Sequence, residues 1–104
     1  GGGAAARIAA AYPEAVSRLV LVSPDVEWSV AQSCFNTPTL IIWAKDDWVN
    51  PIIWACRWRG HPKVTIVTTE TGGHMLQASH AEIISQWLEE QDVLTATCRA
   101  NNDI

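Results

Sequence analysis

The sequence predicts an α/β fold in which three parallel strands are flanked by helices. Three short runs, at residues 18–23, 39–43 and 63–68, are rich in apolar or β-branched side chains, which is typical of strands, and the composition of the first two is typical of buried strands. Segments with helical composition separate or flank these runs, as expected for right-handed crossovers between parallel strands. The chain has 104 residues, of which 48% are apolar and 17% charged, and this is enough for one small hydrophobic core.

The first third of the chain predicts one helix and one strand. Residues 4–12 are rich in alanine, the best helix former, and Pro13 ends this helix. The apolar run at 18–23 reads Arg-Leu-Val-Leu-Val-Ser and is closed by Pro24. Residues 25–36 are polar and irregular, with room for one helical turn around Trp28. We expect that segment to be a connection to the second strand.

Two further helices are predicted from their start signals. Asn50 and Pro51 suit the N-cap and the first position of a helix that runs to about residue 59. Ser79 and Glu82 match a capping box, and the apolar residues that follow give the next helix one hydrophobic face. We expect that helix to end near Asp92. Residues 94–104 have no clear period and are predicted to form a tail.

Composition excludes several classes of function. The net charge is −4 and the seven Lys and Arg residues are scattered, so a nucleic acid is not expected as a partner. No apolar run approaches the ~18 residues of a membrane span. The three cysteines, Cys34, Cys56 and Cys98, share no metal-site spacing and are interpreted as reduced thiols, which favours an intracellular setting.

Acidic residues and a histidine follow two neighbouring strands of the predicted sheet. Asp46 and Asp47 come after the second strand, and His74 follows Gly72-Gly73 after the third. Carboxyl ends of parallel strands meet at one edge of the sheet, where a carboxylate can orient an imidazole base. The alternatives are that the aspartates are solvated, or form an Asx-turn into Asn50, and that the histidine lies in a surface turn.

Three segments, taken in order, resemble the C-terminal part of the α/β-hydrolase fold family. Residues 1–24 resemble the helix behind the family's nucleophile elbow and the strand after it; residues 38–51 resemble the acid strand and loop; Gly72-Gly73-His74 resembles the loop that carries the base. The resemblance implies that Asp47, four residues before Pro51, is the triad acid, with Asp46 as second choice, and that His74 is the base. It covers roughly residues 1–90, so residues 1–93 are expected to be an incomplete hydrolase domain.

The family's third catalytic group is not found in the sequence. Its elbow, G-x-S-x-G, would have Gly1 or Gly2 as the last glycine, so the serine would lie about two residues before the chain begins. Ser23 lacks flanking glycines and Ser79 is better used as a cap. Neither Cys34 nor Cys56 has the setting of a nucleophile. Only 14 residues separate Ser23 from Pro38, so the lid that the family often inserts there is absent or minimal.

Two surfaces are expected to contact other protein segments. The strand at 18–23 would normally pair with the nucleophile-bearing strand, so we expect the N-terminal half of the domain or a partner protein along it. The helix after the acid carries Trp54 and Trp58 and is apolar nearly all round, which predicts a protein contact over these side chains unless both point into the chain's own core.

Two functions remain open at this stage. One is a serine hydrolase acting on esters or related acyl compounds, in which this chain supplies acid and base but no nucleophile. The other is a non-catalytic, hydrolase-like subunit with a structural or interaction role in a larger assembly. No cofactor is expected, and no metal, because His61, His74, His80 and the aspartates match no usual zinc spacing.

Overall fold

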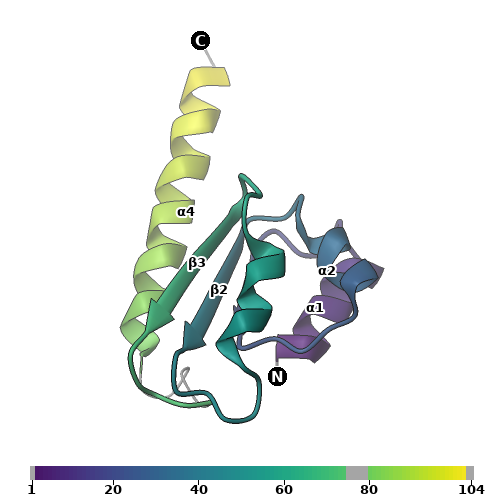
Figure 1. Ribbon diagram of the computed structural model, residues 1–104. Coiled ribbons are helices and arrows are strands. Elements are labelled where there is room, and N and C mark those ends of the chain that lie inside the picture. The colour runs from purple at the N-terminus through teal and green to yellow at the C-terminus, as the bar shows by residue number, and fades with distance from the viewer. Residues whose placement is uncertain (1, 75–79, 103–104) are drawn as a thin grey trace.

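The computed structural model describes residues 2–74 and 80–102. Its elements are α1 (Gly2–Ala11), β1 (Leu19–Val22), α2 (Trp28–Cys34), β2 (Thr39–Ala44), the 3₁₀ helix η1 (Ile52–Trp58), β3 (Val64–Thr69) and α4 (Ala81–Asn102) (Figure 1). The three strands form one parallel sheet in the order β1-β2-β3. The predicted fold class is therefore confirmed.

Strand β2 is the centre of the molecule. It pairs with β1 on one side, where Leu21 lies opposite Ile41, and with β3 on the other, where Ile41 lies opposite Ile66. All six of its residues are buried. A strand with neighbours on both edges and helices on both faces leaves no side chain in water, which explains its apolar composition.

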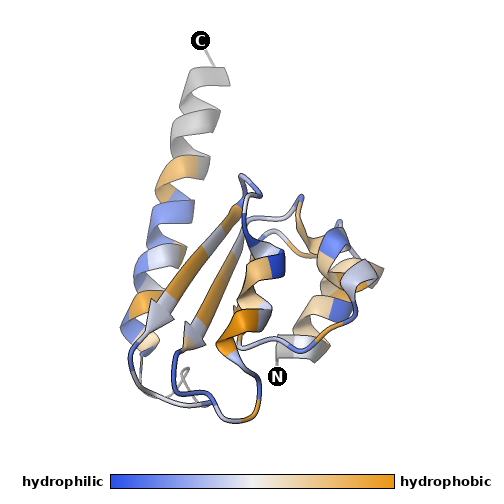
Figure 2. Ribbon diagram, in the orientation of Figure 1, coloured by the Kyte–Doolittle hydropathy of each residue, from blue (hydrophilic) through white to orange (hydrophobic). Residues whose placement is uncertain are grey.

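Helices cover the two faces of the sheet unequally (Figure 1). On one face, Leu21, Ile41 and Trp43 pack with buried residues of α1, α2 and η1. On the other face, Leu40 and Ile42 pack against Trp87 of α4. Successive residues of a strand point to opposite faces, so the same apolar run supplies both clusters. Figure 2 shows strand β2 in orange over most of its length, whereas paler segments interrupt the orange of β3.

Small side chains let α1 lie close to its neighbours. Ala6 and Ala9 are fully buried against the sheet, whereas Ile8 is exposed. A Cβ atom at Gly3 would lie 2.9 Å from the backbone oxygen of Asp25, so the first turn of α1 needs a glycine where it meets the loop after β1.

Two segments between the strands differ from expectation. Residues 28–34 form the helix α2, nearly two turns long, because Ala31 and Cys34 bury one side of it in the core. Asn50 is not the N-cap of η1: Pro51 holds that position with extended backbone, and no side chain caps the helix. The side chain of Asn50 instead donates a hydrogen bond to the carbonyl of Ser23.

The end of α4 also differs from expectation. The helix continues to Asn102, so the prediction that it ends near Asp92, with a tail from residue 94, is wrong for the backbone of residues 94–102. No glycine or proline occurs between Ala81 and Asn102, and nothing in the local sequence stops the helix. Ser79, the predicted cap, lies outside the described residues. Within the described part of the chain, no helix has the length and apolar character needed to cross a membrane.

Candidate functional site

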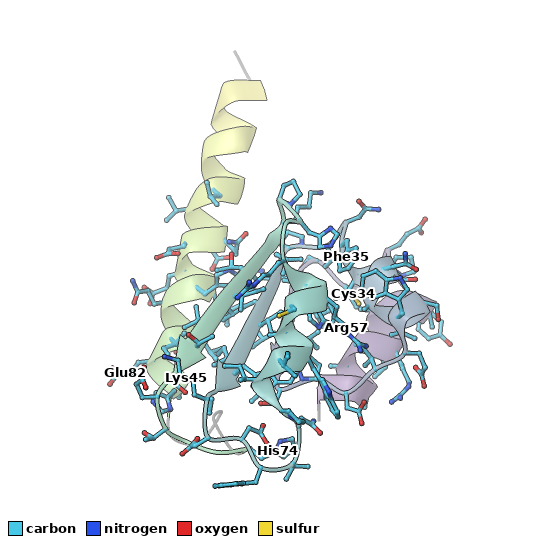
Figure 3. The ribbon with its side chains drawn as sticks, in the orientation of Figure 1. Cys34, Phe35, Lys45, Arg57, His74 and Glu82 are labelled. Atoms are coloured by element: carbon cyan, nitrogen blue, oxygen red, sulfur yellow. The ribbon has the colours of Figure 1, made fainter. Side chains whose placement is uncertain are left out.

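The loops that follow β2 and β3 meet at the carboxyl edge of the sheet. The backbone N–H of Lys45 donates to the carbonyl of Thr69, which extends the pairing of β2 and β3 up to the loops. Beyond this point, residues 45–51 and 70–74 lie side by side, and Figure 3 shows His74 at that end of the sheet. In parallel sheets this edge is where functional side chains gather.

His74 and Asp47 are in direct contact. Nδ1 of His74 lies 3.0 Å from Oδ2 of Asp47, within hydrogen-bonding distance. The Asp47 side chain is completely buried, whereas 40% of the His74 side chain is exposed. The buried carboxylate therefore fixes one ring nitrogen while the imidazole remains accessible.

Backbone amides hold the other oxygen of Asp47. Oδ1 accepts hydrogen bonds from the N–H groups of Val49 (2.8 Å) and Asn50 (2.9 Å). This is an Asx-turn, one of the alternatives that the sequence left open, and it occurs together with the contact to His74. The turn and the histidine use different oxygens, so one carboxylate serves both.

The electrostatics of the site favour a charged Asp47. Burial alone raises the pKa of its carboxyl group, but the N–H of Asn50, the hydroxyl of Ser23, His74 and the N–H of Val49 together outweigh burial and lower that pKa. A carboxylate that receives several hydrogen bonds is stabilised in its ionised form. Asp47 is thus an anion suited to face an imidazole.

Asp46 has a different place from its neighbour. Its Oδ1 accepts a hydrogen bond of 2.8 Å from the backbone N–H of Gly73. Gly72 and Gly73 have φ values of +122° and +59°, which residues with a side chain rarely adopt. Asp46 therefore anchors the glycine turn that carries His74, and it is Asp47 that contacts the imidazole.

Sequence reasoning missed the support that Asn50 gives to this site. Its Nδ2 donates to the carbonyl of Ser23 at 2.7 Å, and its own carbonyl accepts a hydrogen bond of 2.8 Å from Nε1 of Trp43. Asn50 therefore links the end of β1, the end of β2 and the turn around Asp47. The helix-start signal Asn-Pro hid this role, because an asparagine before a proline is typical of an N-cap.

His61, Cys34 and Cys56 lie apart from the site. His61 stacks on Phe35, with ring centroids 3.5 Å apart, at the opposite end of the sheet. Cys34 is buried under α1, and burial raises the pKa of its thiol, while Cys56 is exposed on η1. Among the described residues, no three His, Cys, Asp or Glu side chains gather as they would around a metal ion.

The two tryptophans expected to contact another protein have different environments. Trp58 is 1% exposed within the core and stacks edge-on against Phe35, so the expectation that it lies at a surface contact is wrong. A seven-residue 3₁₀ helix turns one side to the sheet, and Trp58 lies on that side. Trp54 is half-buried and lines a cavity of about 430 Å³, together with Arg7 and Arg57.

Apolar side chains are also exposed beside the acid. Trp48 is 94% exposed, Val49 64% and Ile53 71%, and all three lie within six residues of Asp47. Sequence reasoning did not single them out, because the sequence of a loop does not show whether its apolar residues are exposed or buried. We refer to these three exposed side chains, which follow Asp47 in the sequence, as the apolar rim.

Comparison with known proteins gives one informative match. No protein-family model matches the chain, and no curated protein does. Among solved structures, the chain is similar to the crystal structure of MGS-MChE2, an α/β hydrolase enzyme from the metagenome of sediments from the lagoon of Mar Chica, Morocco, with a TM-score of 0.70 and 21% sequence identity. The match covers 88% of this chain and 58% of that one. At this identity the likeness concerns the fold, and it agrees with the parallel sheet described above: the chain is built on the α/β-hydrolase fold.

Proposed function

We propose that this chain supplies the acid and the base of a catalytic triad in a hydrolase acting on esters or related acyl compounds. The observation that carries the proposal is the 3.0 Å contact between the buried Asp47 carboxylate and Nδ1 of His74, at the carboxyl edge of the sheet. The similar α/β hydrolase structure supports it through the fold alone.

The geometry suits the chemistry of a general base. Nδ1–H of His74 donates to Asp47, which leaves Nε2 free to accept the proton of a serine hydroxyl. Asp47 stabilises the imidazolium that forms, and His74 then gives the proton to the leaving group. The serine and the donors of the oxyanion hole would come from a part of the hydrolase domain outside these 104 residues.

Labelling with a fluorophosphonate tests the proposal in the full protein. The probe forms a covalent bond only with an activated nucleophile, so we expect one serine to be labelled, and mass spectrometry would locate it. His74→Ala should slow the labelling by a factor on the order of 10³ or more, because the serine loses its base. Absence of labelling in a folded parent protein would contradict the proposal.

A non-catalytic role is the second candidate, and the apolar rim favours it. Trp48, Val49 and Ile53 are exposed beside the site, where a partner protein would exclude water from them. A hydrolase-like subunit retained for its surfaces would keep the contact between Asp47 and His74 as a structural element. The residues that precede Gly1 in the full protein distinguish the two candidates: G-x-S-x there supports the enzyme, and any other sequence supports the interaction role.

A further inference from the structure

Three consecutive residues of the loop after β2 each contact β3 or the loop that carries His74. The N–H of Lys45 donates to the last carbonyl of β3 at 2.8 Å. Oδ1 of Asp46 accepts a hydrogen bond of 2.8 Å from the N–H of Gly73. Oδ2 of Asp47 lies 3.0 Å from Nδ1 of His74. The two loops therefore follow each other from the end of the sheet to the imidazole.

The turn that precedes His74 has little structure of its own to hold it. Gly72 and Gly73 both have positive φ, and glycine loses more conformational freedom on folding than any other residue. In the described part of the chain, no backbone carbonyl accepts a hydrogen bond from the N–H groups of residues 71–74. A Cβ atom at Gly73 would meet nothing within 4 Å, so the turn is not packed against a neighbour at this point. Its shape therefore depends on side-chain contacts.

The hydrogen bond between Gly73 and Asp46 is a fixed point directly before the imidazole. A carboxylate that accepts from a backbone N–H makes one of the stronger kinds of hydrogen bond, because the acceptor is charged. Asp46 is half-buried, and it follows Lys45, whose backbone is paired with β3. The donor belongs to the residue adjacent to His74, so the contact reaches the imidazole through a single peptide unit.

A second side-chain pair joins the same two loops farther from the imidazole. Nζ of Lys45 lies 2.6 Å from Oε1 of Glu70, and these side chains are 53% and 82% exposed. Exposed ion pairs contribute little to stability, because water screens them. Glu70 stands four residues before His74, whereas Gly73 is its direct neighbour. This pair provides a comparison in which the loops are joined without contact to the glycine turn.

We propose that Asp46 is a positioning residue for His74. Its hydrogen bond to the N–H of Gly73 holds the glycine turn, so that Nδ1 of the imidazole stays directed at Asp47. This role differs from that of a second acid, since Asp46 acts on the backbone and not on the ring. A catalytic consequence rests on the proposed function, because only an active base needs this orientation. The orientation itself can be measured without activity.

Two NMR measurements on the full protein test the proposal. Exchange of the Gly73 amide with solvent should be slow in the parent and in Asp46→Asn, because asparagine keeps a side-chain oxygen that accepts a hydrogen bond. In Asp46→Ala the exchange should be faster by a factor on the order of ten. The ring ¹⁵N signals of neutral His74 should report one tautomer in the parent and in Asp46→Asn, with the proton on Nδ1. In Asp46→Ala they should shift toward the mixture of tautomers of a free imidazole.

Glu70→Gln is the matched control. It breaks the other side-chain pair between the loops and should leave both NMR measurements unchanged. In a parent protein that reacts with a fluorophosphonate, Asp46→Ala should slow the labelling roughly tenfold, because the base is less well placed. Asp46→Asn should restore most of the rate. A folded parent that is not labelled counts only against the proposed function, since the NMR measurements still test the position of His74.

Three results would overturn the proposal. The first is fast exchange of the Gly73 amide in the parent, which needs no variant to be observed. The second is a set of His74 ring signals that coincide in the parent and Asp46→Ala. The third is a change in Asp46→Asn as large as in Asp46→Ala, because the effect would then come from the charge of Asp46 and not from its hydrogen bond.

Discussion

Asp47 shows how a buried charge is made acceptable inside a small domain. Its carboxylate is removed from water, which would be costly without compensation. Two backbone N–H groups and an imidazole contact it, and they keep the ionised form favoured. Each of these donors comes from a loop that begins at the end of a strand. These hydrogen bonds to the Asp47 carboxylate hold the loops after β2 and β3 together. The same loops orient the carboxylate toward His74.

The lowered pKa of Asp47 predicts how its contribution to stability depends on pH. Because the folded-state pKa lies below the ordinary value of 3.8, the ionised carboxylate stabilises the fold above that pH, and this stabilisation is lost as the pH falls through the folded pKa. Asp47→Asn should lower the free energy of unfolding by about 1–3 kcal/mol at pH 7. Denaturant titrations from pH 7 to pH 3 measure it, and the difference between parent and variant should shrink in acid. A difference that is constant over this range would contradict the prediction.

Two buried tryptophans predict losses of stability of different size for the same substitution. Nε1 of Trp43 donates to the carbonyl of Asn50 at 2.8 Å, whereas Nε1 of Trp87 is buried without a hydrogen-bond partner among the described residues. Trp43→Phe should cost about 1–3 kcal/mol beyond the loss of packing, because it leaves a buried carbonyl unpaired. Trp87→Phe is the control and should cost less, since it removes an unpaired donor. Equal losses in urea denaturation would argue against this role of Trp43.

At the scale of elements, strand β1 has one paired edge and one open edge. The N–H groups of Leu19 and Ser23 donate to residues before and within β2. Alternation along a parallel strand puts the N–H of Leu21 on the same side, and those of Val20 and Val22 on the open side. Open edges of apolar strands accept further strands, so we propose that another segment of the full protein, or a partner, pairs here.

Amide hydrogen exchange tests the pairing at β1. In the isolated chain, the amides of Val20 and Val22 should exchange much faster than that of Leu21, because they have no acceptor. In the full protein or its complex, all three should be protected to a similar degree. Rapid exchange of Val20 and Val22 in the full protein would show that no strand covers this edge.

The elements also show which parts of the fold a sequence can predict. The second strand was expected at 39–43 and is found at Thr39–Ala44. It could be predicted because a strand buried on both faces is a short, continuous apolar run, which is easy to recognise in a sequence. Local signals failed where tertiary contacts decide: Asn50 has the sequence context of a cap, but its side chain bonds to Ser23, 27 residues away. Parallel topology predicted that the aspartate pair and His74 would lie at one edge of the sheet, whereas the choice of Asp47 over Asp46 came from the resemblance to the hydrolase family.

At the scale of the whole molecule, α4 and the open sheet define its shape. The chain measures 50 × 29 × 22 Å along its principal axes, and α4 extends beyond the sheet at the end opposite the candidate site (Figure 1). The site lies where the loops after β2 and β3 meet, and β1 is the edge strand on the other side of β2. The assignment of residues 1–93 to one incomplete hydrolase domain stays a prediction.

An open edge of this kind predicts the behaviour of the isolated chain. We expect the 104 residues alone to self-associate, because pairing along β1 and cover for exposed Trp48 and Ile53 are both missing. Gel filtration with circular dichroism measures this over a range of concentrations. A stable monomer at all concentrations would show that the open edge needs no neighbour.

The central claim is that Asp47 and His74 act together as acid and base, and matched substitutions at two adjacent aspartates test it most directly. The measurement is the rate of fluorophosphonate labelling in the full protein. Asp47→Asn should slow labelling by on the order of 10⁴-fold, because an amide no longer holds the imidazole in the tautomer that accepts a proton. Asp46→Asn keeps an oxygen that can accept from Gly73 N–H and should retain most of the rate. Equal rates in parent and Asp47→Asn, or a larger loss in Asp46→Asn, would contradict the account.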